Sequence, residues 1–300
     1  MNKNKLIGSL LLVTLAIVSC KDPKKANVQV IPLKDSATVI SDSLRFCEGT
    51  CWNGEALYVS NFGGDTINPL NKTGKGYIMK FSASKSTPLV PADGRLNAPK
   101  GMCVVDNYLF VADINSVMVF NINDVSKSQQ IDFPANDSYV NDIAVNGKNM
   151  YVTVTNTGNI YKLDVSAPSL MGHQTPKLFA NVPGANGIVA TDSIIYVASY
   201  PTDGNTTAAN VIYTIKNFDK PVVSKLFNRM GQYDGLALSE DGKSLYFTTW
   251  VNGNVGKINL KDLKVENLIL PIQLSGPADM SMHKGKLYIP DLPNSRILVY

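Results

Sequence analysis

The chain has 300 residues, of which 44% are hydrophobic and 17% are charged, as is ordinary for a soluble globular protein. The net charge is +4, but no basic tract or basic-aromatic stripe occurs, which argues against a nucleic-acid partner. A supply of 22 glycines, 16 prolines, 13 tyrosines and 10 phenylalanines favours strands and tight turns over long helices.

The first nineteen residues are predicted to be a secretory signal rather than part of the fold. Lys3 and Lys5 precede an apolar run over residues 6–18, which is too short to span a bilayer comfortably. The run ends in Ile-Val-Ser-Cys, which resembles a bacterial lipoprotein box in which Cys20 is lipidated and becomes the mature N-terminus. A plain membrane anchor, or a signal cut elsewhere, is the alternative.

This interpretation sets the predicted domain organisation. Residues 1–19 form the signal peptide, residues 20–36 the lipidated cysteine with a polar tether, and residues 37–300 the folded domain. The predicted location is the bacterial cell envelope, where the protein is lipid-anchored to a membrane and faces the periplasm or the outside. Disulfides are permitted in that environment.

Six segments of the folded domain read alike, which indicates an internal repeat. Each contains an aromatic residue in a strand-like run, as in EALYVSNF, NYLFVADI and SIIYVASY. The anchors lie 41 to 52 residues apart, at Tyr58, Phe110, Tyr151, Tyr196, Tyr246 and Tyr288. Further short β-rich runs separated by turns surround each anchor, so the sequence predicts an all-β, six-bladed β-propeller, most likely a monomer in which every blade has four strands.

The last repeat stops after its third strand, because RILVY ends the chain at Tyr300. A three-stranded blade would leave an open edge. The run ATVISDS at residues 37–43 alternates polar and apolar residues. We therefore predict that it is the missing fourth strand and closes the ring by pairing the two ends of the domain.

Residues just before each inner strand are expected to converge on one face of such a ring. Five blades place there Glu48-Gly49, Lys100-Gly101, Asn141-Asp142, Asn186-Gly187 and Asp234-Gly235, and the sixth places Asp279. Two carboxylates and an Asn amide would make an all-oxygen site that suits calcium or magnesium better than zinc. Such residues also form turns in any propeller, and this is the role we expect for Asp142 and Asp279.

The segments CEGTCWNGEALYVSN, ANGIVATDSIIYVAS and YDGLALSEDGKSLYFT resemble the SMP-30/gluconolactonase/luciferin-regenerating propellers, over the whole pattern from about Phe46 onward. The resemblance implies that Glu48, Asn186 and Asp234 bind a divalent metal, with calcium expected and magnesium as the alternative. It implies that Asn141 helps bind metal or substrate. It also implies that Asp234 acts as the base that helps water attack a lactone ester.

The sequence departs from this family at positions that bear on substrate. Thr50 stands where the family has Pro, Ile143 where it often has Gly, and Tyr139 where the sugar-lactone enzymes often carry Arg. Tyr139 is therefore a substrate-binding candidate, and Arg95 or Lys100 is a candidate to supply the missing positive charge. These departures weaken the prediction of a sugar-lactone substrate.

The remaining reactive side chains offer weaker sites. His173 and His283 have neither ligand nor triad spacing, and no G-x-S-x-G segment occurs. Cys47 and Cys51 flank Glu48 without a second cysteine pair or a nearby histidine, so zinc is not expected. They form either a small disulfide that stiffens the Glu48 turn or two small buried hydrophobic side chains.

Two functions remain in view. The first is a divalent-metal-dependent hydrolase of lactone-like esters, similar to gluconolactonase. The alternative is a non-catalytic propeller lipoprotein that binds a small ligand or a protein through the same face. Fold alone does not choose between them.

Overall fold

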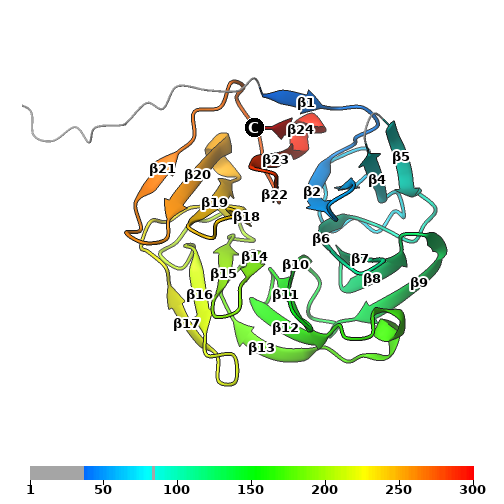
Figure 1. Ribbon diagram of the computed structural model, residues 1–300, viewed down its shortest axis with the longest axis horizontal. Helices are drawn as coiled ribbons and strands as arrows, with labels where there is room; N and C mark the ends of the chain where they lie inside the picture. Colours follow the sequence, from blue (N-terminus) through cyan, green and yellow to red (C-terminus); the bar gives the residue numbers. More distant parts are fainter. Residues whose placement is uncertain (1–36, 83–84) are drawn as a thin grey trace, which may run out of the picture. The chain divides into compact units, whose positions relative to one another are not determined.

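The computed structural model describes residues 37–82 and 85–300. They form six four-stranded antiparallel sheets that follow one another around a common axis, as a six-bladed β-propeller (Figure 1). This confirms the predicted fold class. The predicted signal peptide, the tether and Cys20 lie outside the described residues. Among the helices of the described part, none has the length and apolar character needed to cross a membrane.

Each blade contributes consecutive strands, numbered from the axis outward. Blades 1 to 3 consist of β2 (Cys47–Trp52), β3 (Leu57–Asn61), β4 (Tyr77–Ser82), β5 (Lys85–Val90), β6 (Pro99–Val105), β7 (Tyr108–Asp113), β8 (Ser116–Asn121), β9 (Asp124–Asp132), β10 (Val140–Asn146), β11 (Asn149–Val154), β12 (Asn159–Asp164) and β13 (Lys177–Asn181). Blades 4 to 6 consist of β14 (Ala185–Ala190), β15 (Ile195–Ser199), β16 (Tyr213–Lys216), β17 (Val222–Lys225), β18 (Tyr233–Leu238), β19 (Ser244–Thr249), β20 (Asn254–Asn259), β21 (Val265–Asn267), β22 (Ser281–His283), β23 (Lys286–Asp291), β24 (Arg296–Val299) and β1 (Thr38–Ile40). Three short 3-10 helices lie in the connections, namely η1 (Pro168–His173), η2 (Val251–Gly253) and η3 (Leu292–Asn294).

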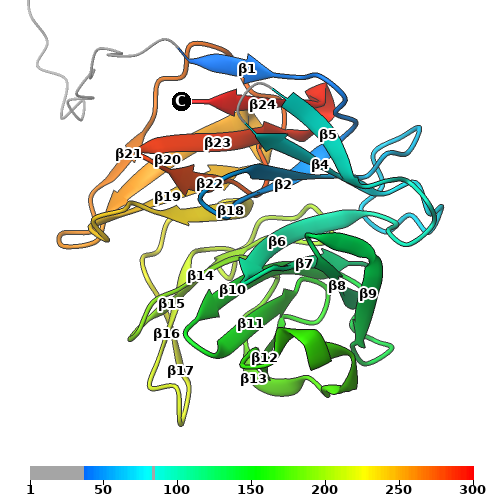
Figure 2. The same cartoon turned by 45° about the vertical axis from the view of Figure 1, so that its right-hand side comes forward.

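The ring is closed by the N-terminal strand, as the sequence predicts. β1 pairs antiparallel with β24, with Thr38 opposite Val299 and Ile40 opposite Ile297. Figure 2 shows β1 lying along β24 at the outer side of the last blade. The first and last strands of the domain therefore belong to one sheet, and β24 has no free edge.

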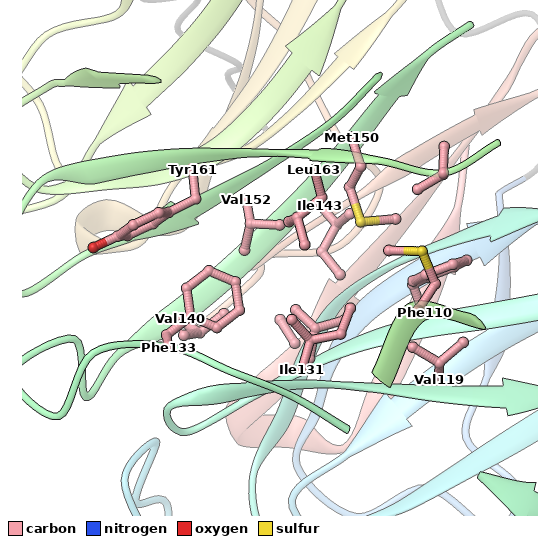
Figure 3. Packing of buried hydrophobic residues seen from close by; sticks show 14 of the residues in the cluster. Phe110, Val119, Ile131, Phe133, Val140, Ile143, Met150, Val152, Tyr161 and Leu163 are labelled. Atoms are coloured by element: carbon pink, nitrogen blue, oxygen red, sulfur yellow. The ribbon is translucent and has the colours of Figure 1, made fainter. Parts of the chain in front are cut away.

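The core lies between neighbouring blades. Because side chains alternate along a strand, each blade packs against both of its neighbours. In β11, Met150 and Val152 face blade 2, whereas Tyr151 faces blade 4. Figure 3 shows the cluster between blades 2 and 3, where Phe110 and Ile131 of blade 2 meet the blade 3 side. Full burial of such a side chain contributes about 1.5–3 kcal/mol, so these clusters hold the blades together.

Candidate functional site

A two-residue bulge in each inner strand positions the candidate residues. In blades 1 to 5 the pairing of the first and second strands shifts register at residues 48–49, 100–101, 141–142, 186–187 and 234–235. A bulge bends its strand and re-aims a side chain. The predicted residues are thus brought to the axis, but they lie inside the inner strands. Their expected placement in turns before the strands was wrong.

The second residue of each bulge is confined by the neighbouring blade. An added Cβ atom at Gly49, Gly101, Gly187 or Gly235 would lie 2.1 to 2.6 Å from atoms of the next blade. Only glycine fits such a close approach without a shift of the backbone. The first residue of each bulge is therefore the one that carries chemistry at this level of the ring.

Four of these first residues line one cavity of about 180 Å³. They are Glu48 of blade 1, Asn141 of blade 3, Asn186 of blade 4 and Asp234 of blade 5, and all four are buried. Each has one buried oxygen atom without a hydrogen-bond partner: Oε2 of Glu48 and the Oδ1 atoms of the other three. A buried polar atom without a partner is costly and calls for an explanation, such as a bound ion or water.

The rest of the cavity wall is aromatic or aliphatic. Phe62, Tyr200, Trp250 and Leu292 each follow the second strand of a blade, and Tyr139 precedes the inner strand of blade 3. Sequence reasoning found Tyr139 and gave Trp250 an apolar-wall role as one of two readings. It missed Phe62, Tyr200 and Leu292, although their shared place after a second strand was a usable signal.

Blade 2 places a cation behind this wall. Lys100 is fully buried, and its ammonium group donates a hydrogen bond of 2.8 Å to the carbonyl oxygen of Ala98. The same group lies 5.7 Å from the ring centre of Phe62 and 5.2 Å from that of Tyr139. Burial lowers the pKa of Lys100, while the nearby Asp113 and Glu48 carboxylates oppose that shift. Lys100 thus supplies positive charge beside Glu48 without lining the cavity.

Burial perturbs the two carboxyl groups in the cavity. Burial, and then the neighbouring Asp234, raises the pKa of Glu48 well above its usual range, and Lys100 partly opposes this. Burial, and then Asp142, raises the pKa of Asp234 to about 7. Each cause is the cost of holding negative charge away from water or beside a like charge.

Asp142 and Asp279 do not act as the turn formers that we expected. Asp142 lies within β10, where its carboxylate accepts hydrogen bonds of 2.7 Å from the backbone N–H groups of Ile143 and Ile188. Its carboxyl group is also hydrogen-bonded to that of Asp279, from the opposite blade. One of the two must carry a proton to donate this bond. Burial raises the pKa of Asp142 to about 7 and that of Asp279 well above its usual range.

These raised pKa values predict a dependence of stability on pH. An unfolded Asp or Glu has a pKa of about 4, so the folded state holds more protons than the unfolded state between about pH 4 and pH 7. That stabilisation is full below pH 4 and is lost as the pH rises through the folded values. We expect metal-free protein to lose on the order of a few kcal/mol between pH 5 and pH 8.

The measurement is a series of thermal melts in chelator over that pH range. The melting temperature should fall toward pH 8, and calcium should restore it there while having little effect at pH 5. A melting temperature that stays level or rises from pH 5 to pH 8 in chelator would contradict the expectation.

Arg95 is not brought to this cavity. It forms an ion pair of 2.6 Å with Asp93, donates to the carbonyl oxygen of Val125, and lies 5.2 Å from the ring centre of Phe120. It lines a separate hollow on the outer part of blade 2. The structure therefore brings together Glu48, Tyr139, Asn141, Asn186 and Asp234, and leaves Arg95 outside.

The cysteines on either side of Glu48 are both buried and free. The bulge between Cys47 and Thr50 turns them to opposite faces of β2. Cys47 packs in the cluster toward blade 6, and Cys51 in the cluster toward blade 2. The structure therefore supports the interpretation as small buried hydrophobic side chains, and not the disulfide.

Trp52 lies away from the cavity. It is at the other end of β2, where its ring stacks on His283 at 4.2 Å. His173 is exposed in η1. The two histidines and the first tryptophan therefore take no part in the candidate site.

The donor set is unusual for a metal centre because half of it is amide. Within residues 37–82 and 85–300, no group of three or more His, Cys, Asp and Glu side chains is arranged to hold a metal. Glu48, Asn141, Asn186 and Asp234 instead offer four oxygen atoms, two of them on carboxyl groups. Hard cations such as calcium take carboxylate and amide oxygens as ligands, so the chemistry of this set fits such an ion.

Comparisons with known proteins extend the fold but not the family. No protein-family model and no curated protein matches the chain. Among solved structures, the chain is similar to one from a nidogen/laminin complex, at 14% identity and a TM-score of 0.59, over 85% of this chain and 86% of that chain. It is similar to a protein of unknown function from Bacteroides thetaiotaomicron, at 13% identity and a TM-score of 0.61, over 88% and 76%.

A third similar structure is a catalytically inactive histidine-to-alanine variant of virginiamycin B lyase from Staphylococcus aureus with quinupristin. It has 14% identity and a TM-score of 0.57, over 88% of this chain and 98% of that chain. At such identities the similarity establishes a shared β-propeller fold and leaves the function to be argued from the site.

Proposed function

We propose that this protein is a divalent-metal-dependent hydrolase of lactone-like esters, related to the SMP-30/gluconolactonase propellers. One observation carries the proposal: four buried oxygen atoms without partners, from four different blades, line the same cavity. These oxygens belong to the residues that the family resemblance assigns to metal and substrate. Turn formation alone explains neither their burial nor their unpaired state.

The charges around the cavity support a bound cation. Four buried carboxyl groups surround the axis, on Glu48, Asp142, Asp234 and Asp279, and Lys100 is the cation beside them. The proton shared by Asp142 and Asp279 removes one negative charge, and Lys100 balances another. A divalent cation held by Glu48, Asn141, Asn186 and Asp234 would balance the remaining two. Calcium suits this oxygen set best, with magnesium as the alternative.

In the proposed reaction, a bound divalent ion supplies a Lewis acid that polarises the ester carbonyl. The Asp234 carboxylate takes a proton from the attacking water, the acyl carbon–oxygen bond breaks, and the proton passes to the leaving alkoxide. A base is most effective when its pKa is near the working pH, and burial raises that of Asp234 to about 7. The aromatic wall excludes water from the rest of the ester.

The alternative is a propeller that binds a ligand or a protein without catalysis. One observation favours it: among the described residues, no histidine, lysine or arginine lines the cavity. No side chain there is a ready proton donor to a leaving group other than tyrosine or a protonated carboxyl group. One similar fold comes from a nidogen/laminin complex, in which a propeller occurs in a protein assembly.

Two measurements on purified protein separate these functions. Titration calorimetry with calcium and with magnesium should show one binding site that chelator abolishes, and an assay of lactone opening should show turnover that needs the metal. Metal binding without turnover would favour the binding propeller. Absence of any metal binding would overturn the metal-dependent mechanism.

We also propose that the protein is a lipoprotein of the bacterial envelope, anchored through Cys20. Acyl chains on a cysteine supply membrane affinity that a single polar tether does not. Cys20→Ser should therefore move the protein from the membrane fraction, which detergent releases, to a soluble or unprocessed form. Mature protein in the soluble fraction with Cys20 intact would rule out lipidation.

A further inference from the structure

The side of the cavity opposite the four oxygen-bearing residues is built to hold a ring. We infer that the site takes an uncharged ester or lactone carried on a single aromatic or alicyclic ring, in preference to a polyhydroxylated sugar lactone. The ester part of this inference rests on the proposed function, whereas the ring part rests on the wall of the cavity alone.

The volume of the cavity limits the ligand to about one ring. It encloses about 180 Å³. An apolar cavity of roughly 150 Å³ accommodates one benzene molecule. A single six-membered ring with a short fused or attached ester therefore fills the space, and a larger body would have to extend through the mouth.

The chemistry of the wall excludes a sugar. Apart from the four oxygen-bearing residues, the lining side chains are apolar or aromatic, and among the described residues the only lining hydroxyl groups belong to Tyr139 and Tyr200. A sugar lactone would bury several hydroxyl groups against Phe62, Trp250 and Leu292. Each buried hydroxyl without a partner weakens binding, whereas an apolar ring gains from the same contact.

The wall is held in place before any ligand arrives. The six-membered ring of Trp250 lies against Gly276, where an added Cβ atom would come within 2.8 Å of two ring carbons. Phe62, Ala278 and Leu292 belong to one buried cluster, and Trp250 packs against it. A rigid aromatic face of this kind favours stacked or edge-on contact with a second ring.

The experiment compares two lactams, which resemble lactones but resist hydrolysis. Dihydroquinolinone carries one aromatic ring, and gluconolactam carries the hydroxyl groups of a sugar. Titration calorimetry on the whole protein, with and without calcium, should give dihydroquinolinone an affinity at least about tenfold higher than that of gluconolactam. Trp250→Ala should weaken the aromatic lactam by about tenfold, and Val251→Ala, an exposed neighbour outside the cavity wall, should leave it unchanged.

Gly276→Ala is a second test of the wall, because the added methyl group would displace the Trp250 ring while Trp250 itself remains. It should also weaken the aromatic lactam and leave gluconolactam unaffected. Gluconolactam binding as tightly as the aromatic lactam, no binding of the aromatic lactam, or aromatic binding that ignores both variants would overturn the inference.

Turnover of dihydrocoumarin and of gluconolactone, measured in parallel, keeps the two proposals apart. Trp250-dependent binding of the aromatic lactam without opening of either lactone would leave the ligand class standing and remove the hydrolase. Opening of gluconolactone with preferred binding of gluconolactam would leave the hydrolase standing and remove the ligand class.

Discussion

Asp234→Asn should abolish the calcium-induced rise in melting temperature and any lactone opening, while making the metal-free protein more stable at pH 8. The substitution keeps the shape of the side chain but removes a buried negative charge. That charge is favourable only when a cation is bound. At calcium concentrations about a hundredfold above the dissociation constant, the parent should gain about 2.7 kcal/mol from binding, and the variant should gain little of this.

The matched control is Asp241→Asn, in the same blade, because the Asp241 side chain is exposed in the hairpin between β18 and β19. It should respond to calcium as the parent does. An equal calcium response in Asp234→Asn, Asp241→Asn and the parent would remove Asp234 from the site. Lactone opening retained in Asp234→Asn would remove it as the base.

Asp142→Asn serves as a different kind of comparison. We would expect no effect if Asp142 only formed a turn. In the structure each of its carboxylate oxygens accepts one backbone hydrogen bond, and an amide would leave one of these N–H groups without an acceptor. The variant should therefore be destabilised, by about 1–3 kcal/mol, while its calcium response persists.

A chain that begins at Leu44 should be far less stable than one that begins at Ala37, because only the longer chain contains β1. Loss of β1 removes the strand that pairs with β24 and the contact of Ile40 with the cluster between blades 6 and 1. About three backbone hydrogen bonds and one partly buried side chain correspond to roughly 3–4 kcal/mol. For a domain of this size, that lowers the melting temperature by roughly 10 °C.

The exposed edge of β24 also predicts self-association of the shorter chain, since an unpaired strand is a template for another strand. Thermal melts and size-exclusion chromatography of the two chains test both effects. A shorter chain that stays monomeric with an unchanged melting temperature would show that β1 does not secure the ring.

The architecture could be predicted because it is written locally and repeatedly. Six aromatic anchors at similar spacing each specify a second strand, and the incomplete last repeat leaves one place for residues 37–43. The same repetition aligned Glu48, Asn141, Asn186 and Asp234, so their convergence followed once the ring was inferred.

Other features could not be predicted because they depend on contacts between blades. Nothing in the local sequence distinguishes Asp142, which reaches an N–H group of blade 4, from an aspartate that forms a turn. The bulge that separates Cys47 from Cys51 is likewise invisible in a run that reads as a plain strand. Arg95 was chosen for its charge, and its side chain is held on the outside of blade 2 by Asp93.

The pairing of β1 with β24 has a consequence for the order of the chain. Thr38 lies opposite Val299, so the beginning and the end of the ring are neighbours in one sheet. A short linker from Tyr300 to Ala37 would therefore be compatible with the same six sheets, and new termini could be opened in the exposed connection between β16 and β17. The fold would then be a circularly permuted propeller, whose closure depends on blade 4 rather than blade 6, with every residue of the cavity in its original blade.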